Sequence, residues 1–183
     1  MIPLRFEYVR PKTIDAALEL LGSREDARVL AGGHSLIPLM RLRLAEPGLV
    51  VDIGALEGLK ELVHEDGSFH IGALSTHAQL AADAQLKRHA PALWDAANHL
   101  GDPQVRNRGT VGGACAHADP SADYPAVLLA LDALFSVLGK DGSREVSAAD
   151  FFVGTFETAL LPGEIIRSIE FACEEGGSGM DAS

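Results

Sequence analysis

Two segments of the sequence join adjacent glycines to small polar residues, a composition that suits the binding of an anion. The first is Ala31-Gly32-Gly33-His34-Ser35 and the second is Thr110-Val111-Gly112-Gly113-Ala114. Adjacent glycines permit positive φ angles and carry no Cβ, so backbone N–H groups can converge on a phosphate. Where such a turn leads into a helix, the helix dipole adds to the attraction. Taken alone, the first segment fits an ordinary tight turn equally well.

The elements that must position these segments follow from the apolar pattern. Over residues 1–55 short apolar runs alternate with helical spacing. The pattern predicts strands over 6–8, 28–31 and 49–53, and helices that begin after Thr13 and Ser35. The first glycine pair therefore lies between a strand and a helix. Such an alternation predicts a small parallel α/β lobe over residues 1–55.

Residues 56–173 follow a different pattern, with a hairpin signal at Glu65-Asp66-Gly67 and a capping box at Thr76–Gln79. The other predicted elements are a helix through Leu80 and Leu86, a helix from Pro91, a polar loop over 102–109, a helix over 125–132, and strands over 133–138 and 164–171. We therefore expect an α+β fold with two lobes, in which the larger lobe, residues 56–173, has a mainly antiparallel sheet. Residues 174–183 are small, polar and glycine-rich, and we expect them to form a flexible tail.

Charge and cysteine content exclude several classes of function. A formal net charge of −11 argues against nucleic acid, because binding to it depends on Lys and Arg that neutralise phosphates. The N-terminus has no long apolar run, so we expect a cytoplasmic protein without a signal peptide or a transmembrane segment. Two cysteines cannot ligate an iron–sulfur cluster, so any cluster must sit on another chain. Cys115 is expected to be a buried small hydrophobe.

The second glycine pair belongs to a longer pattern that resembles a known family. Its segment reads Arg106-Asn107-Arg108-Gly109-Thr110-Val111-Gly112-Gly113-Ala114, and Ala118-Asp119-Pro120-Ser121-Ala122-Asp123 follows. Together with Ala31–Ser35, these blocks are similar in order and spacing to those of the FAD-binding (medium) subunits of molybdenum hydroxylases. That family includes carbon monoxide dehydrogenase medium subunits and xanthine dehydrogenase flavin domains, with a PCMH-type FAD-binding domain. The resemblance covers residues 1 to about 173.

The resemblance implies an FAD cofactor held between the two lobes. Ala31–Ser35 and Thr110–Ala114 would surround its pyrophosphate and ribityl chain. Asp123 would accept hydrogen bonds at the adenosine end, because a carboxylate offers only acceptors. Ile166 would pack against flavin or adenine. The residues alone also allow Asp123 to be a helix N-cap before Pro125.

The resemblance also implies partners. FAD would carry electrons from an iron–sulfur small subunit, with 2Fe–2S clusters, and a molybdenum large subunit, with the molybdenum cofactor, to an external acceptor. The chain would then be an oxidoreductase subunit without catalytic side chains of its own. Ala114 stands where the family usually has Asn, and family members normally continue into a further small domain. These departures favour an alternative, a truncated, FAD-poor interaction module that docks in the same complex. A self-contained flavin oxidase is a third interpretation.

The histidines and two arginines complete the set of candidate residues. Of seven histidines, only His34 and His117 lie in the motif blocks, where we interpret them as cofactor-shell residues. The others, His77 among them, are predicted to be surface or structural residues, because they form no metal-binding pattern. Arg106 and Arg108 could steer phosphate, bind a partner subunit or belong to a solvated loop, and the residues alone do not decide between these.

Overall fold

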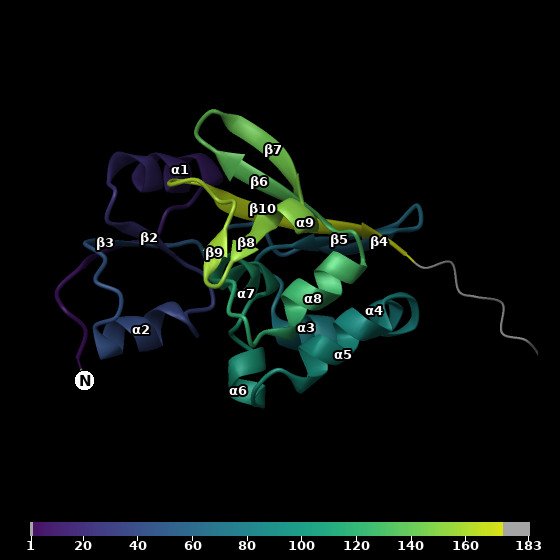
Figure 1. Cartoon of the computed structure of the whole chain (residues 1–183). Coiled ribbons are helices and arrows are strands. Elements are labelled where there is room, and N and C mark those ends of the chain that lie inside the picture. Colours follow the sequence, from purple (N-terminus) through teal and green to yellow (C-terminus); the bar gives the residue numbers. More distant parts are fainter. Residues whose placement is uncertain (1, 174–183) are drawn as a thin grey trace, which may run out of the picture.

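The computed structural model describes residues 2–173, and its two main sheets divide them into two lobes (Figure 1). Lobe 1 holds a three-stranded sheet in the order β1-β3-β2. Its strands are β1, Glu7–Val9, β2, Ala27–Leu30, and β3, Leu49–Asp52. Both pairings are parallel, which confirms the prediction from the alternating pattern. The connecting helices α1, Ile14–Ser23, and α2, Leu36–Leu42, lie on opposite sides of this sheet in Figure 1.

Lobe 2 is built on a five-stranded antiparallel sheet in the order β4-β5-β10-β6-β7. Its strands are β4, Leu62–Glu65, β5, Ser68–Gly72, β6, Leu134–Gly139, β7, Gly142–Ser147, and β10, Ile165–Ala172. Asp66 and Gly67 both have positive φ angles, as a two-residue hairpin turn between β4 and β5 requires. The last strand along the chain, β10, takes the central place and pairs with β5 and β6.

Most helices of lobe 2 gather on one face of the large sheet (Figure 1). They are α3, His77–Ala82, α4, Ala84–His89, α5, Pro91–His99, α6, Pro103–Arg106, α7, Val111–His117, and α8, Asp123–Ala130. The predicted capping box is confirmed, since the Thr76 hydroxyl accepts from the Gln79 N–H at 3.2 Å. A short helix α9, Ala148–Phe151, and a hairpin of β8, Phe152–Gly154, and β9, Glu157–Thr158, were not predicted.

Two predictions for these helices were wrong. The helix expected to run through Leu80 and Leu86 is broken at Asp83, whose carboxylate accepts from the Leu86 N–H at 2.6 Å and so begins α4. The expected polar loop over 102–109 contains α6, which the Asp102 side chain caps in the same way. In both cases an aspartate side chain accepts a hydrogen bond from a backbone N–H at the start of a helix, and the spacing of apolar residues carries no signal of such a cap.

Within residues 2–173 no helix has the length and apolarity needed to span a bilayer.

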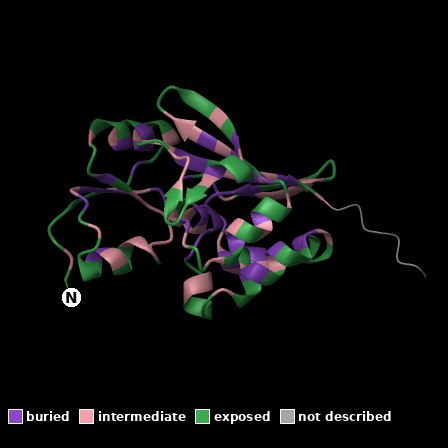
Figure 2. Cartoon of the chain, in the orientation of Figure 1, coloured by how far each residue is buried: buried purple, intermediate pink, exposed green. Residues whose placement is uncertain are grey.

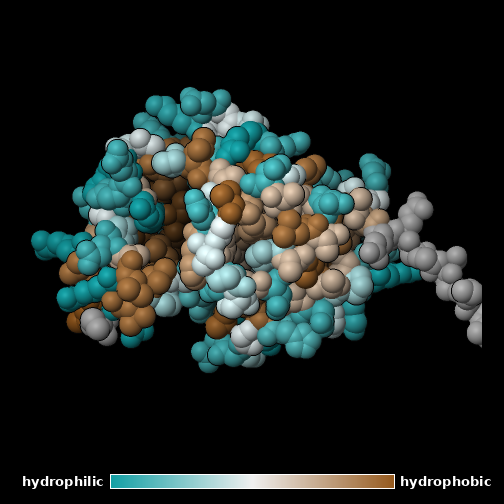
Figure 3. Space-filling view, viewed as in Figure 1, coloured by the Kyte–Doolittle hydropathy of each residue, from teal (hydrophilic) through white to brown (hydrophobic). Residues whose placement is uncertain are grey.

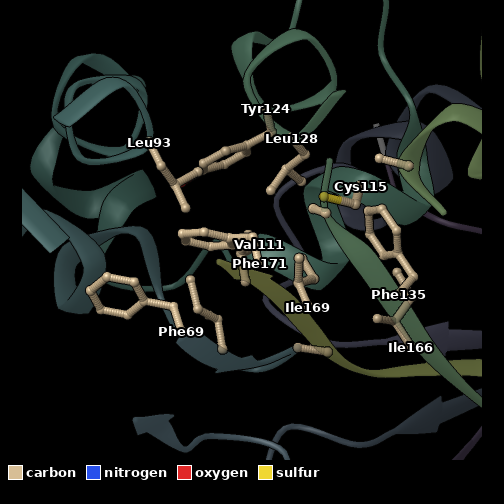
Figure 4. Close-up of a cluster of buried hydrophobic side chains, with 14 of the residues drawn as sticks. Phe69, Leu93, Val111, Cys115, Tyr124, Leu128, Phe135, Ile166, Ile169 and Phe171 are labelled. Atoms are coloured by element: carbon tan, nitrogen blue, oxygen red, sulfur yellow. The ribbon is translucent and has the colours of Figure 1, made fainter. Parts of the chain in front are cut away.

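Buried apolar residues form two clusters, one within lobe 2 and one between lobe 1 and lobe 2. In Figure 2 buried residues, coloured purple, lie in both lobes. The larger cluster lies between the helices and the sheet of lobe 2, and Figure 4 shows part of it. The smaller cluster joins α1 and β3 to residues from further along the chain, which are Leu56, Leu59, Leu74 and Ile165. β10 therefore serves both clusters, with Ile165 in the smaller and Ile166 and Ile169 in the larger. Residue 55 remains a proposed boundary between the lobes.

Candidate functional site

A cleft of about 710 Å³ opens between the lobes, and both glycine-containing segments contribute to its wall. This volume falls within the range of roughly 300–1,000 Å³ that is usual for small-molecule and cofactor sites. Lobe 1 lines the cleft with the end of β2 and the start of α2, and lobe 2 lines it with α7 and the residues before α6 and α8. In Figure 3 the surface is hollowed between the lobes, and apolar residues, coloured brown, lie in the hollow.

Gly32 shows how closely the two lobes approach each other. A Cβ placed on Gly32 would lie 2.2 Å from the carbonyl oxygen of Arg108 and 2.9 Å from the Cα of Gly109. A Cβ on Gly113 would lie 3.8 Å from the Cβ of Ala31. The first segment thus contacts the backbone of Arg108 and Gly109, just before the second segment. Glycine is required at Gly32 because this backbone of the other lobe fills the space of a side chain.

The first segment, residues 31–35, leaves its backbone donors unused. Gly33 has a φ of 81°, the left-handed conformation that glycine adopts without strain. Among residues 2–173, the N–H groups of Gly32, Gly33, His34 and Ser35 have no hydrogen-bond acceptor. The Ser35 hydroxyl does not cap α2, although Ser35 occupies the N-cap position. This segment therefore offers several N–H donors and a hydroxyl to a ligand in the cleft.

The second segment differs from the expected turn, because Val111–Ala114 forms the first turn of α7. The Thr110 hydroxyl caps this helix by accepting from the Gly113 N–H at 3.2 Å. The N–H groups of Val111 and Gly112 donate to the carbonyls of Ser75 at 3.0 Å and Ala73 at 2.9 Å. The expectation that these amides converge on an anion is therefore wrong, since they attach α7 to the chain after β5.

Gly112 is needed for packing. A Cβ on Gly112 would lie 2.5 Å from the Cβ of Ala73 and 2.8 Å from its carbonyl oxygen. Gly112 is buried, and its φ angle is helical, so conformational freedom is not the reason for glycine here. The two glycine pairs look alike in the sequence, yet the second one lets a helix lie against a strand end.

Nine of the twelve predicted site residues line the cleft, and three do not. The nine are Ala31, Gly32, Gly33, His34, Ser35, Thr110, Gly113, Ala114 and Asp123. Val111, Gly112 and Ile166 are buried elsewhere, and Figure 4 shows Val111 and Ile166 among the apolar side chains of lobe 2. Ile166 was expected to contact a flavin or adenine ring, but its side chain packs in the core. Cys115 is fully buried there, as predicted, and burial raises the pKa of its thiol.

Asp123 is exposed at the rim of the cleft, where its carboxylate can accept hydrogen bonds. It is the first residue of α8, whose N-cap is Ala122, so the N-cap interpretation of Asp123 is wrong.

Arg106 donates to the carbonyl oxygens of Leu100 and Gly101, at 3.3 and 2.8 Å, and so holds the loop before α6. Arg108 is exposed.

His77 is a residue of the cleft that the sequence did not single out. Its ring is buried, with 3% of the residue exposed, and its Nδ1 lies 2.8 Å from the Tyr124 hydroxyl. Burial, with a smaller contribution from nearby His34, lowers the pKa of His77 to about 4. No local pattern marks His77, because its place depends on the isolated bridge between Thr76 and Thr110, the residues that precede α3 and α7.

The chain matches the protein family described as FAD binding domain in molybdopterin dehydrogenase over residues 4–171. The carbon monoxide dehydrogenase medium chain of Hydrogenophaga pseudoflava is 42% identical over 180 residues, which are 98% of this chain and 63% of the relative. The 6-hydroxypseudooxynicotine dehydrogenase complex subunit alpha of Paenarthrobacter nicotinovorans is 40% identical over 98% of this chain and 61% of its own length.

Solved structures also match the chain over nearly its whole length. A carbon monoxide dehydrogenase from Hydrogenophaga pseudoflava matches with a TM-score of 0.94 and 42% identity, over 97% of this chain and 62% of that chain. Quinoline 2-oxidoreductase from Pseudomonas putida 86 matches with a TM-score of 0.92 and 34% identity, over 96% of this chain and 61% of that chain. The chain thus spans less than two thirds of the length of these relatives.

Proposed function

Because the chain belongs to the family of FAD-binding domains of molybdopterin dehydrogenases, we propose that it binds FAD in the cleft between its lobes and carries electrons within an oxidoreductase complex. One observation carries this proposal. Two glycine-containing segments, one from each lobe, meet at the wall of a single cleft. A dinucleotide with two phosphates is a ligand that such an arrangement suits.

The residues of the cleft fit FAD. The N–H groups of Gly32, Gly33, His34 and Ser35 would bind the pyrophosphate, since they have no acceptor among residues 2–173. Asp123 at the rim would accept hydrogen bonds from ribose hydroxyls. Ala31 and Gly113, which face each other, leave room for the cofactor because neither carries a long side chain.

The other predicted residues have supporting roles in this proposal. Thr110 and Ala114 would form part of the cleft wall, and Val111, Gly112 and Ile166 would support it from the core. The isoalloxazine ring supplies the redox chemistry when FAD is bound. The chain's own residues bind, orient and shield the cofactor, and no side chain has to act as a nucleophile or a base.

The partners are part of the same proposal. Electrons would come from an iron–sulfur subunit that is fed by a molybdenum subunit, and an external acceptor would take them from the flavin. The relatives named as medium chains and complex subunits support this assignment of the redox steps to separate subunits. We place the complex in the cytoplasm, as expected from the sequence.

The visible spectrum of the purified 183-residue chain tests the proposal. A yellow protein with bands near ~370 and ~450 nm and one FAD per chain is the expected result, because these bands belong to a protein-bound flavin. A colourless protein that takes up no added FAD would contradict it and would favour the interaction module. Bleaching of the flavin by a small alcohol, with this chain alone, would favour the self-contained oxidase.

A further inference from the structure

His77 is held at the wall of the cleft by contacts of both its backbone and its ring. It is the first residue of α3, and its N–H donates to the carbonyl of Gly109 at 3.1 Å. This places the imidazole beside the second glycine-containing segment, with 3% of the residue exposed.

The two ring nitrogens of His77 have different surroundings. Nδ1 lies 2.8 Å from the hydroxyl of Tyr124, a residue that is fully buried. Nε2 makes no hydrogen bond to residues 2–173. However, within that range every fully enclosed side-chain nitrogen or oxygen has a hydrogen-bond partner. Nε2 is therefore not enclosed, and because His77 lines the cleft, Nε2 is reached from the cleft.

Tyr124 determines which ring nitrogen carries the proton. Within residues 2–173 the acceptor for the Tyr124 O–H is Nδ1 of His77, and a buried hydroxyl without an acceptor costs free energy. Tyr124 must therefore donate and Nδ1 must accept, which leaves the proton of the neutral imidazole on Nε2. Burial, and to a smaller extent His34, lowers the pKa of His77 to about 4, so the ring is neutral at pH 7.

We propose that His77, oriented by Tyr124, presents its Nε2–H to the cleft as a fixed, neutral hydrogen-bond donor to an oxygen of bound FAD. The inference rests on the proposed function, and it makes Tyr124 a positioning residue. Gly109 keeps the donor accessible, because a Cβ on Gly109 would lie 2.7 Å from both Cδ2 and Nε2 of His77. A side chain at that position would displace the ring or cover its edge.

Two variants of His77 separate the roles of its nitrogens. In His77→Asn the amide replaces Nδ1, so the contact with Tyr124 can persist while the donor toward the cleft is lost. In His77→Gln the amide reaches the place of Nε2 and keeps that donor. Titration of FAD into the apo 183-residue chain, followed by quenching of flavin fluorescence, should show an FAD Kd about tenfold higher for His77→Asn. His77→Gln should bind FAD more tightly than His77→Asn does, because it keeps the donor toward the cleft. Gly109→Ala should bind FAD more weakly than the unaltered chain.

The tautomer of His77 gives a second measurement that needs no variant and no FAD. ¹⁵N NMR of the apo chain should show an imidazole with the proton on Nε2, and Tyr124→Phe should produce a mixture of both tautomers. A proton found on Nδ1 in the unaltered chain would overturn the inference. So would equal FAD affinity of His77→Asn and the unaltered chain, with the proposed function left intact. If the unaltered chain binds no FAD, the proposed function fails and the inference falls with it.

Discussion

Gly32→Ala tests whether the two lobes must touch for the cleft to form. The added Cβ would start 2.2 Å from the carbonyl oxygen of Arg108, whereas ordinary contacts lie at 3.4–4 Å. The backbone of the first segment must therefore move away from Arg108 by about 1.2 Å or more, because neither atom belongs to a flexible side chain. Such overpacking typically destabilises a protein by about 1–3 kcal/mol. The same displacement moves the N–H donors of the first segment away from the second, so FAD affinity should fall by about tenfold or more.

Two measurements on the same protein check this prediction. Thermal unfolding of the apo chain should show a Tm lower by about 2–12 °C, and fluorescence titration should show the weaker binding of FAD. Gly22→Ala is the matched control, since a Cβ on Gly22 in α1 would meet nothing within 4 Å. The control should bind FAD normally and gain about 0.5–1 kcal/mol in stability. A Gly32→Ala variant with the Tm and FAD affinity of the unaltered chain would refute the close approach of the lobes.

Three further predictions concern Gly33, Gly112 and the response of stability to pH. Gly33→Val should bind no FAD, because valine resists a φ of 81° and its Cβ would start 2.7 Å from Ile37. Gly112→Val should fold poorly, as seen by circular dichroism, because its Cβ would overlap Ala73. Stoichiometric FAD in either purified variant would contradict these predictions. The pKa of His77 is lowered from 6.5 to about 4 in the folded chain, so between pH 6.5 and 4 the unfolded chain binds more protons than the folded chain. The free energy of unfolding should therefore fall by up to about 3 kcal/mol as the pH is lowered from 6.5 to 4. Urea unfolding at stepped pH should show a smaller loss for His77→Gln, and identical profiles would contradict the lowered pKa.

The fold was largely predictable, because its main signals are local. The cap at Thr13, the hairpin turn at Asp66-Gly67 and the capping box at Thr76 each bind backbone groups within a few residues, so they can be recognised in the sequence. The break at Asp83 was missed because Leu80 and Leu86 continue the apolar spacing across it. Only the structure shows that the Asp83 carboxylate caps a new helix.

The site was predictable as a pair of segments but not in its details. Both glycine pairs satisfy the same sequence pattern, and what separates them is the partner of each N–H group. Gly112 donates to Ala73, a residue far away in the chain, whereas Gly32 and Gly33 have no acceptor in residues 2–173. The burial of His77 has the same origin, since it depends on the bridge between Thr76 and Thr110 and on the contact of its ring with Tyr124. Tertiary packing of this kind leaves no local signal.

The shared strand β10 has a consequence for how the cleft is maintained. Ile165 belongs to the smaller apolar cluster, with residues of α1 and β3 in lobe 1, and Ile166 belongs to the larger cluster of lobe 2. A hinge motion that opened the lobes would have to pull adjacent residues of one strand out of their cores. Folding therefore already places the two halves of the cleft against each other. Binding of a ligand then costs the protein little conformational entropy, because the halves need not be assembled. For the same reason the lobes should unfold together, in one cooperative transition.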